Sequence, residues 1–209
     1  MDTTKMAVEL FDRRAGDYQE KFMNVDLYAD SLDLFCQSIE KQNPSVLELA
    51  CGPGNVTAYL LNKRPDLQIL GTDLAPGMLE LARKNNPTAS FQVMDIRDTA
   101  RLGRCFDGIL CGFGLPYLSR EDSLQWIADA ARTLYPAGVL YLSTMEDDYS
   151  NSGIQYSSKG EPLYMFFHQA DYLTEALQNN GLTLIGVQRK QYPSPSGGTT
   201  TDLLILARK

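Results

Sequence analysis

The sequence predicts an α/β fold in which a seven-stranded, mostly parallel β-sheet carries helices on both of its faces. Short apolar runs alternate with amphipathic helical segments between residues 46 and 144, which is typical of parallel strands joined by helices. A turn with two glycines separates the first run from the helix after it, as in many open α/β sheets. The last two apolar runs are joined by residues 193–198, too few for a crossover helix, which predicts an antiparallel hairpin.

The size and composition indicate one globular domain over residues 1–209. A chain of 209 residues can bury a full hydrophobic core, and its 44% hydrophobic and 22% charged content is typical of such domains. The formal net charge of −7 argues against a nucleic-acid partner, because an interface with phosphates needs clustered Lys and Arg.

The cysteines and the start of the chain predict a reduced, cytoplasmic protein without a metal site. Cys36, Cys51, Cys105 and Cys111 include no C-x-x-C pair, which disfavours zinc, and three of them lie in or beside apolar runs as buried thiols do. The first five residues are polar and lack the apolar core of a signal peptide. No apolar run approaches the length of a membrane span, so we expect no membrane partner.

Residues 1–40 are expected to form a helical cap ahead of the first strand. Residues 4–22 are polar with scattered apolar positions, and we expect a short helix followed by an irregular segment around residues 16–18. A second helix is predicted by apolar residues at helical spacing, namely Leu32, Phe35, Cys36 and Ile39.

Five strands then alternate with helices. The expected strands are residues 46–49, 67–72, 90–94, 106–111 and 139–144, with a turn at 136–138. Helices are expected at residues 56–63, from Pro76 and from Ser119. Pro76 suits the first turn of a helix, and Ser119 with Asp122 resembles a capping box.

The alternation ends after the fifth strand. We expect a long loop at residues 146–162, a short strand at 164–167, a helix at 170–180 and strands at 182–190 and 201–207. Residues 146–168 therefore form an insert between the fifth strand and the helix after it.

Three acidic residues fall at the C-terminal ends of three successive strands. Glu48, Asp73 and Asp95 each end or follow an apolar run, and in an open parallel sheet this edge is where ligands bind. A carboxylate after the second strand can accept hydrogen bonds from both hydroxyls of a ribose. Gly52 and Gly54 let backbone N–H groups approach the same ligand, because no Cβ stands in the way.

Two ligands suit this pattern, NAD and S-adenosylmethionine (SAM), and the residues favour SAM. A dinucleotide fingerprint would place a third glycine at position 57, where this chain has Thr57. A pyrophosphate gains nothing from Glu48 just ahead of the turn, whereas the amino group and sulfonium of SAM do. A hydride-transfer enzyme also usually needs a second domain for its substrate, and we predict none.

The motifs resemble those of the class I SAM-dependent methyltransferases, in that family's order, over residues 40–209. ELACGPG at residues 48–54 resembles motif I, although Ala50 replaces its first glycine. LGTDLAPGML at residues 70–79 resembles the ribose-binding segment, VMDIR at 93–97 the adenine-contacting segment and FDGILC at 106–111 the fourth strand. The terminal hairpin resembles the family's antiparallel seventh strand. The resemblance therefore implies the strand order 3-2-1-4-5-7-6 and a small-molecule methyltransferase.

The resemblance also implies roles for individual residues. The glycine turn and Glu48 would hold the methionine part of SAM, and Asp73 would hold the ribose. Adenine contacts would come from Leu74, Asp95 and Ile96, contacts beside the sulfonium from Cys111 and Gly112, and closure over the cofactor from Tyr18. The full set of implied cofactor-binding residues is Tyr18, Glu48, Ala50, Gly52, Gly54, Asp73, Leu74, Met78, Asp95, Ile96, Cys111 and Gly112.

Three residues are candidates for the catalytic step. Methyl transfer mainly requires that the acceptor lie behind the activated methyl group, and a base is needed only for a protonated acceptor. His168 is the only histidine, and its ordinary pKa suits a base, although a histidine at a helix start can also simply pack the lid. Glu146 is a second candidate base, and Tyr117 is a candidate to orient the acceptor.

We therefore expect transfer of a methyl group from SAM to a small molecule, with S-adenosyl-L-homocysteine (SAH) as the other product. Residues 1–40 and the substrate-lid insert at residues 146–168 are expected to cover the pocket. Two alternatives stay open: a SAM-binding sensor or non-catalytic partner subunit, and an NAD-linked oxidoreductase. We expect a monomer or a homodimer.

Overall fold

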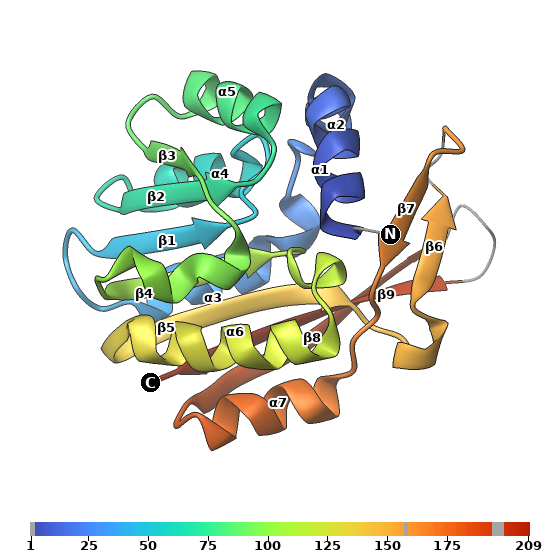
Figure 1. Cartoon of the computed structure of the whole chain (residues 1–209). Helices are drawn as coiled ribbons and strands as arrows, with labels where there is room; N and C mark the ends of the chain where they lie inside the picture. Colours follow the sequence, from blue (N-terminus) through green and yellow to red (C-terminus); the bar gives the residue numbers. More distant parts are fainter. Residues whose placement is uncertain (1–2, 157–158, 194–198) are drawn as a thin grey trace.

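A seven-stranded sheet forms the centre of the computed structural model (Figure 1), which describes residues 3–156, 159–193 and 199–209. In chain order its strands are β1 (Ser45–Leu49), β2 (Gln68–Asp73), β3 (Ser90–Val93), β4 (Phe106–Gly112), β5 (Leu134–Met145), β8 (Thr183–Pro193) and β9 (Thr199–Arg208). They lie in the order β3-β2-β1-β4-β5-β9-β8, and β9 is antiparallel to both of its neighbours. Counted within this sheet, the order is the predicted 3-2-1-4-5-7-6, and the predicted fold class is confirmed.

Helices cover both faces of the sheet, as the alternating pattern predicted. They are α3 (Ala29–Ser38), α4 (Asn55–Lys63), α5 (Pro76–Asn85), α6 (Arg120–Thr133) and α7 (Ala170–Asn179). Phe35 of α3 and Leu60 of α4 belong to one buried cluster, and Trp126 of α6 and Leu173 of α7 belong to another. In Figure 1, α6 and α7 lie in front of the sheet and α3 and α4 lie behind it.

Successive residues of the central strands enter opposite clusters. In β1, Leu47 and Leu49 pack in the cluster of α6 and α7, whereas Val46 packs in the cluster of α3 and α4. All three are fully buried. This burial on both faces explains why the parallel strands read as continuous apolar runs rather than as alternating ones.

Two helix starts use the local chemistry that the sequence predicted. Pro76 occupies the first turn of α5, where its missing N–H costs no helical hydrogen bond. The Ser119 hydroxyl accepts a 3.1 Å hydrogen bond from the Asp122 N–H at the start of α6. Both helices follow strands whose C-terminal ends form the edge described below.

The N-terminal cap is more helical than expected. It consists of α1 (Thr3–Arg13) and α2 (Ala15–Phe22), and a 3₁₀ turn, η1 (Asp26–Tyr28), precedes α3. The expectation of an irregular segment at residues 16–18 is wrong, because these residues lie inside α2. Ala15 and Tyr18 pack against Ala75 and Met78 at the start of α5, and this tertiary packing outweighs the poor helix propensity of Gly16.

The insert after β5 contains structure that the sequence did not predict. The expected loop at residues 146–162 instead holds a 3₁₀ turn, η4 (Tyr149–Asn151), and β6 (Gly153–Tyr156). The expected short strand is present as β7 (Pro162–Met165), and it pairs with β6 in a separate antiparallel sheet. Leu163 of β7 packs against Ala7 and Leu10 of α1, so the insert contacts the cap, as Figure 1 shows.

Strand β5 starts five residues earlier than expected, since Leu134 already pairs with Phe106. Residues 136–138, predicted as a turn, are a strand irregularity in which Ala137 has φ +64°. The Ala137 N–H bonds to the Lys209 carbonyl oxygen at 3.0 Å, so the end of β9 holds this irregularity in the sheet. Most of the predicted hairpin turn at residues 193–198 lies outside the described residues.

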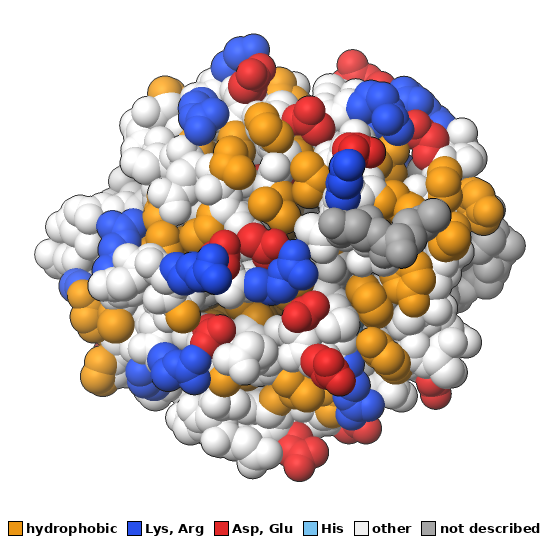
Figure 2. All heavy atoms as spheres, in the orientation of Figure 1, with side chains coloured by type: hydrophobic (Ala, Val, Ile, Leu, Met, Phe, Trp, Pro, Cys, Tyr) orange, Lys and Arg blue, Asp and Glu red, His pale blue; other side chains and the backbone are white. Residues whose placement is uncertain are grey.

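Surface charge is mixed on the face shown in Figure 2, where acidic and basic side chains alternate around hydrophobic ones. Among the described residues, no helix combines the length and the apolar character needed to cross a membrane. The four cysteines are free thiols, and Cys36, Cys51 and Cys111 are buried as expected.

Candidate functional site

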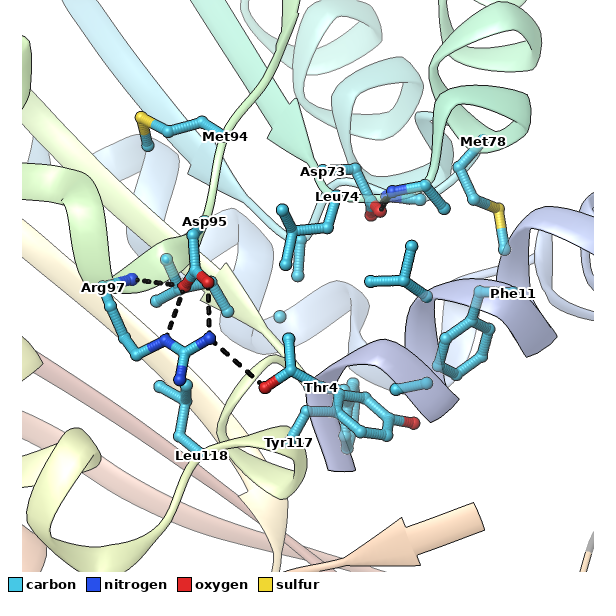
Figure 3. Close-up of a pocket in the computed structure, with 18 of the residues that line it drawn as sticks. Thr4, Phe11, Asp73, Leu74, Met78, Met94, Asp95, Arg97, Tyr117 and Leu118 are labelled. Atoms are coloured by element: carbon cyan, nitrogen blue, oxygen red, sulfur yellow. Dashed lines mark hydrogen bonds and ion pairs between the residues drawn. The ribbon is translucent and has the colours of Figure 1, made fainter. Parts of the chain in front are cut away.

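A pocket lies where the C-terminal ends of β1, β2 and β4 meet the N-terminal cap (Figure 3). The empty space between its walls is about 820 Å³, a volume that includes open solvent at the mouth. The wall that we call the sheet side comprises Ala50, Gly52, Asp73, Leu74, Ala75, Met78, Met94, Asp95, Ile96, Arg97, Gly112, Phe113, Tyr117 and Leu118. The wall that we call the cap side comprises Thr4, Ala7, Val8, Phe11 and Tyr18.

The turn after β1 has left-handed backbone at three positions. Ala50, Gly52 and Gly54 have φ angles of +51°, +52° and +77°, and Ala50 adopts the conformation despite its Cβ. A Cβ at Gly54 would lie 2.3 Å from Nδ2 of Asn86, so this position requires glycine. The replacement of a motif glycine by Ala50 leaves the turn intact.

Asp73 lies at the end of β2 and faces the pocket (Figure 3). Its carboxylate accepts 2.9 Å hydrogen bonds from the N–H groups of Gly52 and Ala75. Burial raises the pKa of Asp73 despite these hydrogen bonds, which act in the opposite direction. A carboxylate can accept about four hydrogen bonds, so Asp73 fixes the glycine turn and keeps capacity for a ligand.

Asp95 lies after β3 and caps the 3₁₀ segment η2 (Ile96–Leu102). Its Oδ1 accepts hydrogen bonds from the Arg97 backbone N–H and Nε, both at 2.9 Å, and its Oδ2 accepts one from Arg97 Nη2 at 2.6 Å. Burial alone would raise the pKa of Asp95, but the hydrogen bonds from Arg97 outweigh burial and lower it. Asp95 is therefore an ionised acceptor at the pocket wall.

Three residues of the implied cofactor set do not line the pocket: Glu48, Gly54 and Cys111. Glu48 is buried beneath the turn, where its Oε2 accepts a 2.5 Å hydrogen bond from the Thr57 hydroxyl. Burial raises the pKa of Glu48 to about 7. Burial also raises the pKa of the Cys111 thiol to about 12, and Cys111 packs in the cluster of α6 and α7.

His168 also lies outside the pocket. It is fully buried, and its Nε2 is 2.9 Å from the Leu115 carbonyl oxygen while its Nδ1 contacts the Tyr172 hydroxyl. Burial lowers its pKa. With both ring nitrogens engaged by the protein, this geometry opposes the predicted role of His168 as a base and matches a histidine that packs the lid.

Glu146 lies in a separate shallow hollow with Asp147, Asp148 and Asp171. Its carboxylate receives hydrogen bonds from Arg189 Nε at 2.5 Å and Arg189 Nη2 at 2.8 Å. It also accepts a 3.3 Å hydrogen bond from the Ala170 N–H at the start of α7. These contacts tie the end of β5 to β8 and α7, and they oppose a role for Glu146 in the pocket.

Two tyrosines line the pocket as expected, Tyr18 from α2 and Tyr117 from the 3₁₀ turn η3 (Leu115–Tyr117). The Phe11 ring lies edge-on to both, at centroid distances of 5.9 Å from Tyr18 and 5.3 Å from Tyr117. Burial raises the pKa of both phenols, that of Tyr18 to about 12. Both hydroxyls stay protonated, and neither bonds to another residue that the structure describes.

The α1 side chains were not predicted, and Arg97 was predicted only as part of the adenine-contacting segment. No motif marks Thr4, Val8 or Phe11, because only the fold brings α1 over the sheet edge. Phe113, for which the sequence leaves pocket lining and core packing equally open, lines the pocket. It has φ +54° and donates its N–H to Ser143 oxygens at 3.1 and 3.2 Å. Left-handed backbone at a non-glycine residue beside a pocket is a conformation that clusters at functional sites, but it has no sequence signature.

Comparison with known proteins identifies sequences that are similar to this chain. A family model described as "Methyltransferase domain" matches residues 46–138. The chain is 32% identical over 143 residues to the demethylmenaquinone methyltransferase of Thermotoga maritima, covering 67% of this chain and 62% of that protein. It is 37% identical over 95 residues to the trans-aconitate 2-methyltransferase of Variovorax paradoxus, covering 46% of this chain and 36% of that protein. The chain thus spans less than two thirds of these relatives.

Two solved structures have the same fold at low sequence identity. The N-methyltransferase NodS from Bradyrhizobium japonicum WM9, in complex with SAH, has a TM-score of 0.72 and 18% identity over 100% of this chain and 99% of that one. The 1,6-didemethyltoxoflavin-N1-methyltransferase of Burkholderia thailandensis, with bound SAH, has a TM-score of 0.69 and 22% identity over 98% of this chain and 88% of that one.

Proposed function

We propose that the chain is a class I SAM-dependent methyltransferase that transfers a methyl group from SAM to a small-molecule acceptor. The observation that carries the proposal is the convergence of Gly52, Asp73 and Asp95 on one pocket at the C-terminal ends of the strands. These are the residues that the resemblance assigned to the methionine part, the ribose and the adenine.

The pocket residues fit this cofactor. In the proposal, Asp73 accepts hydrogen bonds from the ribose hydroxyls, Leu74 and Ile96 enclose the adenine, and the Gly52 turn supports the methionine part. The ring of Tyr18 lies over Gly52, because a Cβ at Gly52 would be 3.7 Å from Cε1 of Tyr18. This position supports the proposed closure of the pocket by Tyr18 above the turn.

The structure favours SAM over NAD at the position of the third fingerprint glycine. Thr57 is fully buried in α4, and its hydroxyl is used by Glu48. The dinucleotide fingerprint has a glycine or alanine there so that the helix can pack closely on the strand. Glu48 instead places an acidic group beneath the turn, which suits a ligand that carries an amino group and a sulfonium.

In this proposal, the chain catalyses the reaction mainly by placing the acceptor next to the methyl group of SAM. SAM supplies a methyl group that is already activated, so the residues of the pocket need only orient the acceptor. We propose that Tyr117 and Phe113 line the acceptor side, where the protonated Tyr117 hydroxyl orients the acceptor by a hydrogen bond. Because His168 and Glu146 lie outside the pocket, we propose that the acceptor is methylated without a base from these two residues.

The acceptor class and the setting are also part of the proposal. The curated relatives are named for demethylmenaquinone and trans-aconitate, and we propose a comparably small acceptor here. We propose a cytoplasmic enzyme, monomeric or homodimeric. A net charge of −7 and the mixed surface charge support the absence of a nucleic-acid partner.

Two measurements test the proposal against its alternatives. Isothermal titration with SAH and with NAD⁺ should show binding of SAH alone, and binding of NAD⁺ alone would favour the oxidoreductase. Incubation with methyl-labelled SAM and fractionated metabolite extracts should then label a small molecule and release SAH. Binding of SAH without label transfer to any fraction would favour the sensor or partner subunit.

A further inference from the structure

We propose that Arg97 is a positioning residue that joins the adenine end of the pocket to the N-terminal cap, so that cofactor binding orders α1. The inference rests on the proposed function, because it takes the adenine of SAM to lie beside Asp95. It gives Arg97 a role that the motif resemblance does not assign, although Arg97 lies in the segment that resembles the adenine-contacting one.

The Arg97 guanidinium contacts Asp95, which caps its own 3₁₀ segment, and two other elements, α1 and α6; Figure 3 shows the contacts with Asp95 and Thr4. The guanidinium forms the two-pronged pair with Asp95 after β3, and its Nη2 also donates a 3.2 Å hydrogen bond to the Thr4 hydroxyl of α1. Its Nη1 lies 4.0 Å from a carboxylate oxygen of Asp122 in α6. The planar guanidinium has several N–H donors at fixed angles, so it can bind Asp95 and Thr4 at the same time. The single ammonium group of a lysine lacks this fixed geometry.

The contact with Thr4 fixes the part of the cap that covers the pocket. Thr4 lies in the first turn of α1, and the same helix contributes Ala7, Val8 and Phe11 to the cap side. The C-terminal end of α1 is joined to the β6–β7 insert, where Glu161 pairs with Arg13 and Arg14 at 3.0 Å. Arg97 therefore links the first turn of α1 to the sheet side of the pocket.

The contact with Asp95 orients the group that we assign to adenine. Arg97 holds both carboxylate oxygens: Oδ1 accepts two hydrogen bonds, whereas Oδ2 accepts one and keeps a lone pair for a donor such as the adenine amino group. A bound adenine limits the rotation of Asp95, and the guanidinium transmits this restriction to Thr4. Binding at one end of the pocket then stabilises the helix that closes it, which is a coupling between two sites through one side chain.

The chain offers a matched control on the same segment. Arg101 also lies in η2 and pairs with an aspartate of that segment, Asp98, at 2.9 Å. Its side chain is 82% exposed, and it does not line the pocket. Replacement of Arg101 removes the same charge from the same 3₁₀ segment without touching Thr4 or Asp95.

The first test compares SAH affinity in Arg97→Ala and Arg101→Ala by isothermal titration. We expect a loss of about tenfold or more for Arg97→Ala, since a charge-assisted pair at the ligand is removed, and less than twofold for Arg101→Ala. Arg97→Lys should recover only part of the loss. Equal affinities in the two alanine variants would overturn the proposal.

The second test separates coupling from general support of the fold. Hydrogen exchange is followed with saturating SAH in the wild type, Arg97→Ala, Arg101→Ala and Thr4→Val, which keeps the Arg97–Asp95 pair. SAH should protect residues 50–54 in all four proteins, but it should protect residues 3–13 only in the wild type and Arg101→Ala. Equal protection of residues 3–13 in all four proteins would contradict the coupling.

A failure of the proposed function would be visible separately. If the wild type does not bind SAH, the methyltransferase proposal fails, and exchange in the ligand-free proteins then decides the role of Arg97. Faster exchange of residues 3–13 in Arg97→Ala and Thr4→Val than in Arg101→Ala supports the link to the cap. Identical exchange in the three variants overturns it.

Discussion

The two walls of the pocket are built by different means. On the sheet side, Gly52, Asp73 and Asp95 stand at or just after the ends of strands, where the two carboxylates accept hydrogen bonds of 2.9 Å from backbone N–H groups of the turns at this edge. On the cap side, contacts join segments far apart in sequence, such as Arg14 with Glu161. Most of these side chains are exposed or half-buried, whereas Asp73 is held beneath the cap.

This difference predicts that the two walls of the pocket have different functions. Buried hydrogen-bonded groups are expensive to remove, and exposed ion pairs contribute little to stability and are screened by salt. We therefore expect the sheet side to set cofactor affinity and the cap side to set how fast the cofactor enters and leaves.

The largest effect is expected at Asp73. Asp73→Ala should weaken SAH binding by about a hundredfold, because it removes charge-assisted hydrogen bonds to the ribose and frees the Gly52 N–H. Isothermal titration measures the change, with Asp98→Ala, at an aspartate that does not line the pocket, as the control. A loss of less than threefold, in a variant with unchanged thermal unfolding, would remove Asp73 from the ribose site.

The next effect is expected at Glu48, beneath the sheet side. Its pKa of about 7 in the folded protein lies above its ordinary value of 4.5, so the folded state binds the extra proton between these values. The free energy of unfolding contributed by Glu48 should therefore fall as pH rises from about 4.5 to 7 and level off above 7.

Glu48→Gln tests this expectation, because the amide cannot ionise. The difference in unfolding free energy between the wild type and Glu48→Gln should change by about 2 kcal/mol between pH 5 and 7, in the direction that disfavours the wild type at higher pH. Urea unfolding at four pH values measures it. A difference that is flat across this range would mean that Glu48 ionises normally.

A smaller effect on stability is expected at His168. His168→Ala should lower the free energy of unfolding by about 1 to 2 kcal/mol, since it leaves polar groups at Leu115 and Tyr172 without a partner. SAH affinity should stay within twofold, because His168 lies outside the pocket. Chemical denaturation and titration measure the two quantities, with Tyr172→Phe as the partner control. A large change in SAH affinity with an unchanged free energy of unfolding would indicate that His168 contributes to the cofactor site.

The smallest effect is expected at Glu161. Glu161→Gln removes the pairs with Arg13 and Arg14 that join the cap to the insert. SAH should dissociate about threefold faster in low salt, and the difference should shrink as salt screens the pairs. Stopped-flow displacement measures the rate, and Glu9→Gln, whose pair with Lys5 lies within α1, is the control. A dissociation rate that changes neither with the substitution nor with salt would show that the ion pairs of Glu161 do not control the release of SAH.

The same difference between the two walls explains which features of the structure could be predicted from the sequence. Asp73 and Asp95 were predictable because a strand end and a turn are local features, and parallel strands bring their C-terminal ends to one edge. The helical conformation at Gly16 and strand β6 were not, since both depend on packing against α5 or β7. His168 was assigned by residue type alone, and only the fold shows that its ring nitrogens face Leu115 and Tyr172.

The most direct test of the account is a crystal structure of the protein with SAH. We expect the ribose hydroxyls within hydrogen-bond distance of the Asp73 carboxylate, the adenine between Leu74 and Ile96 beside Asp95, and the homocysteine over the Gly52 turn. SAH bound elsewhere, or bound with its ribose away from Asp73, would contradict the account.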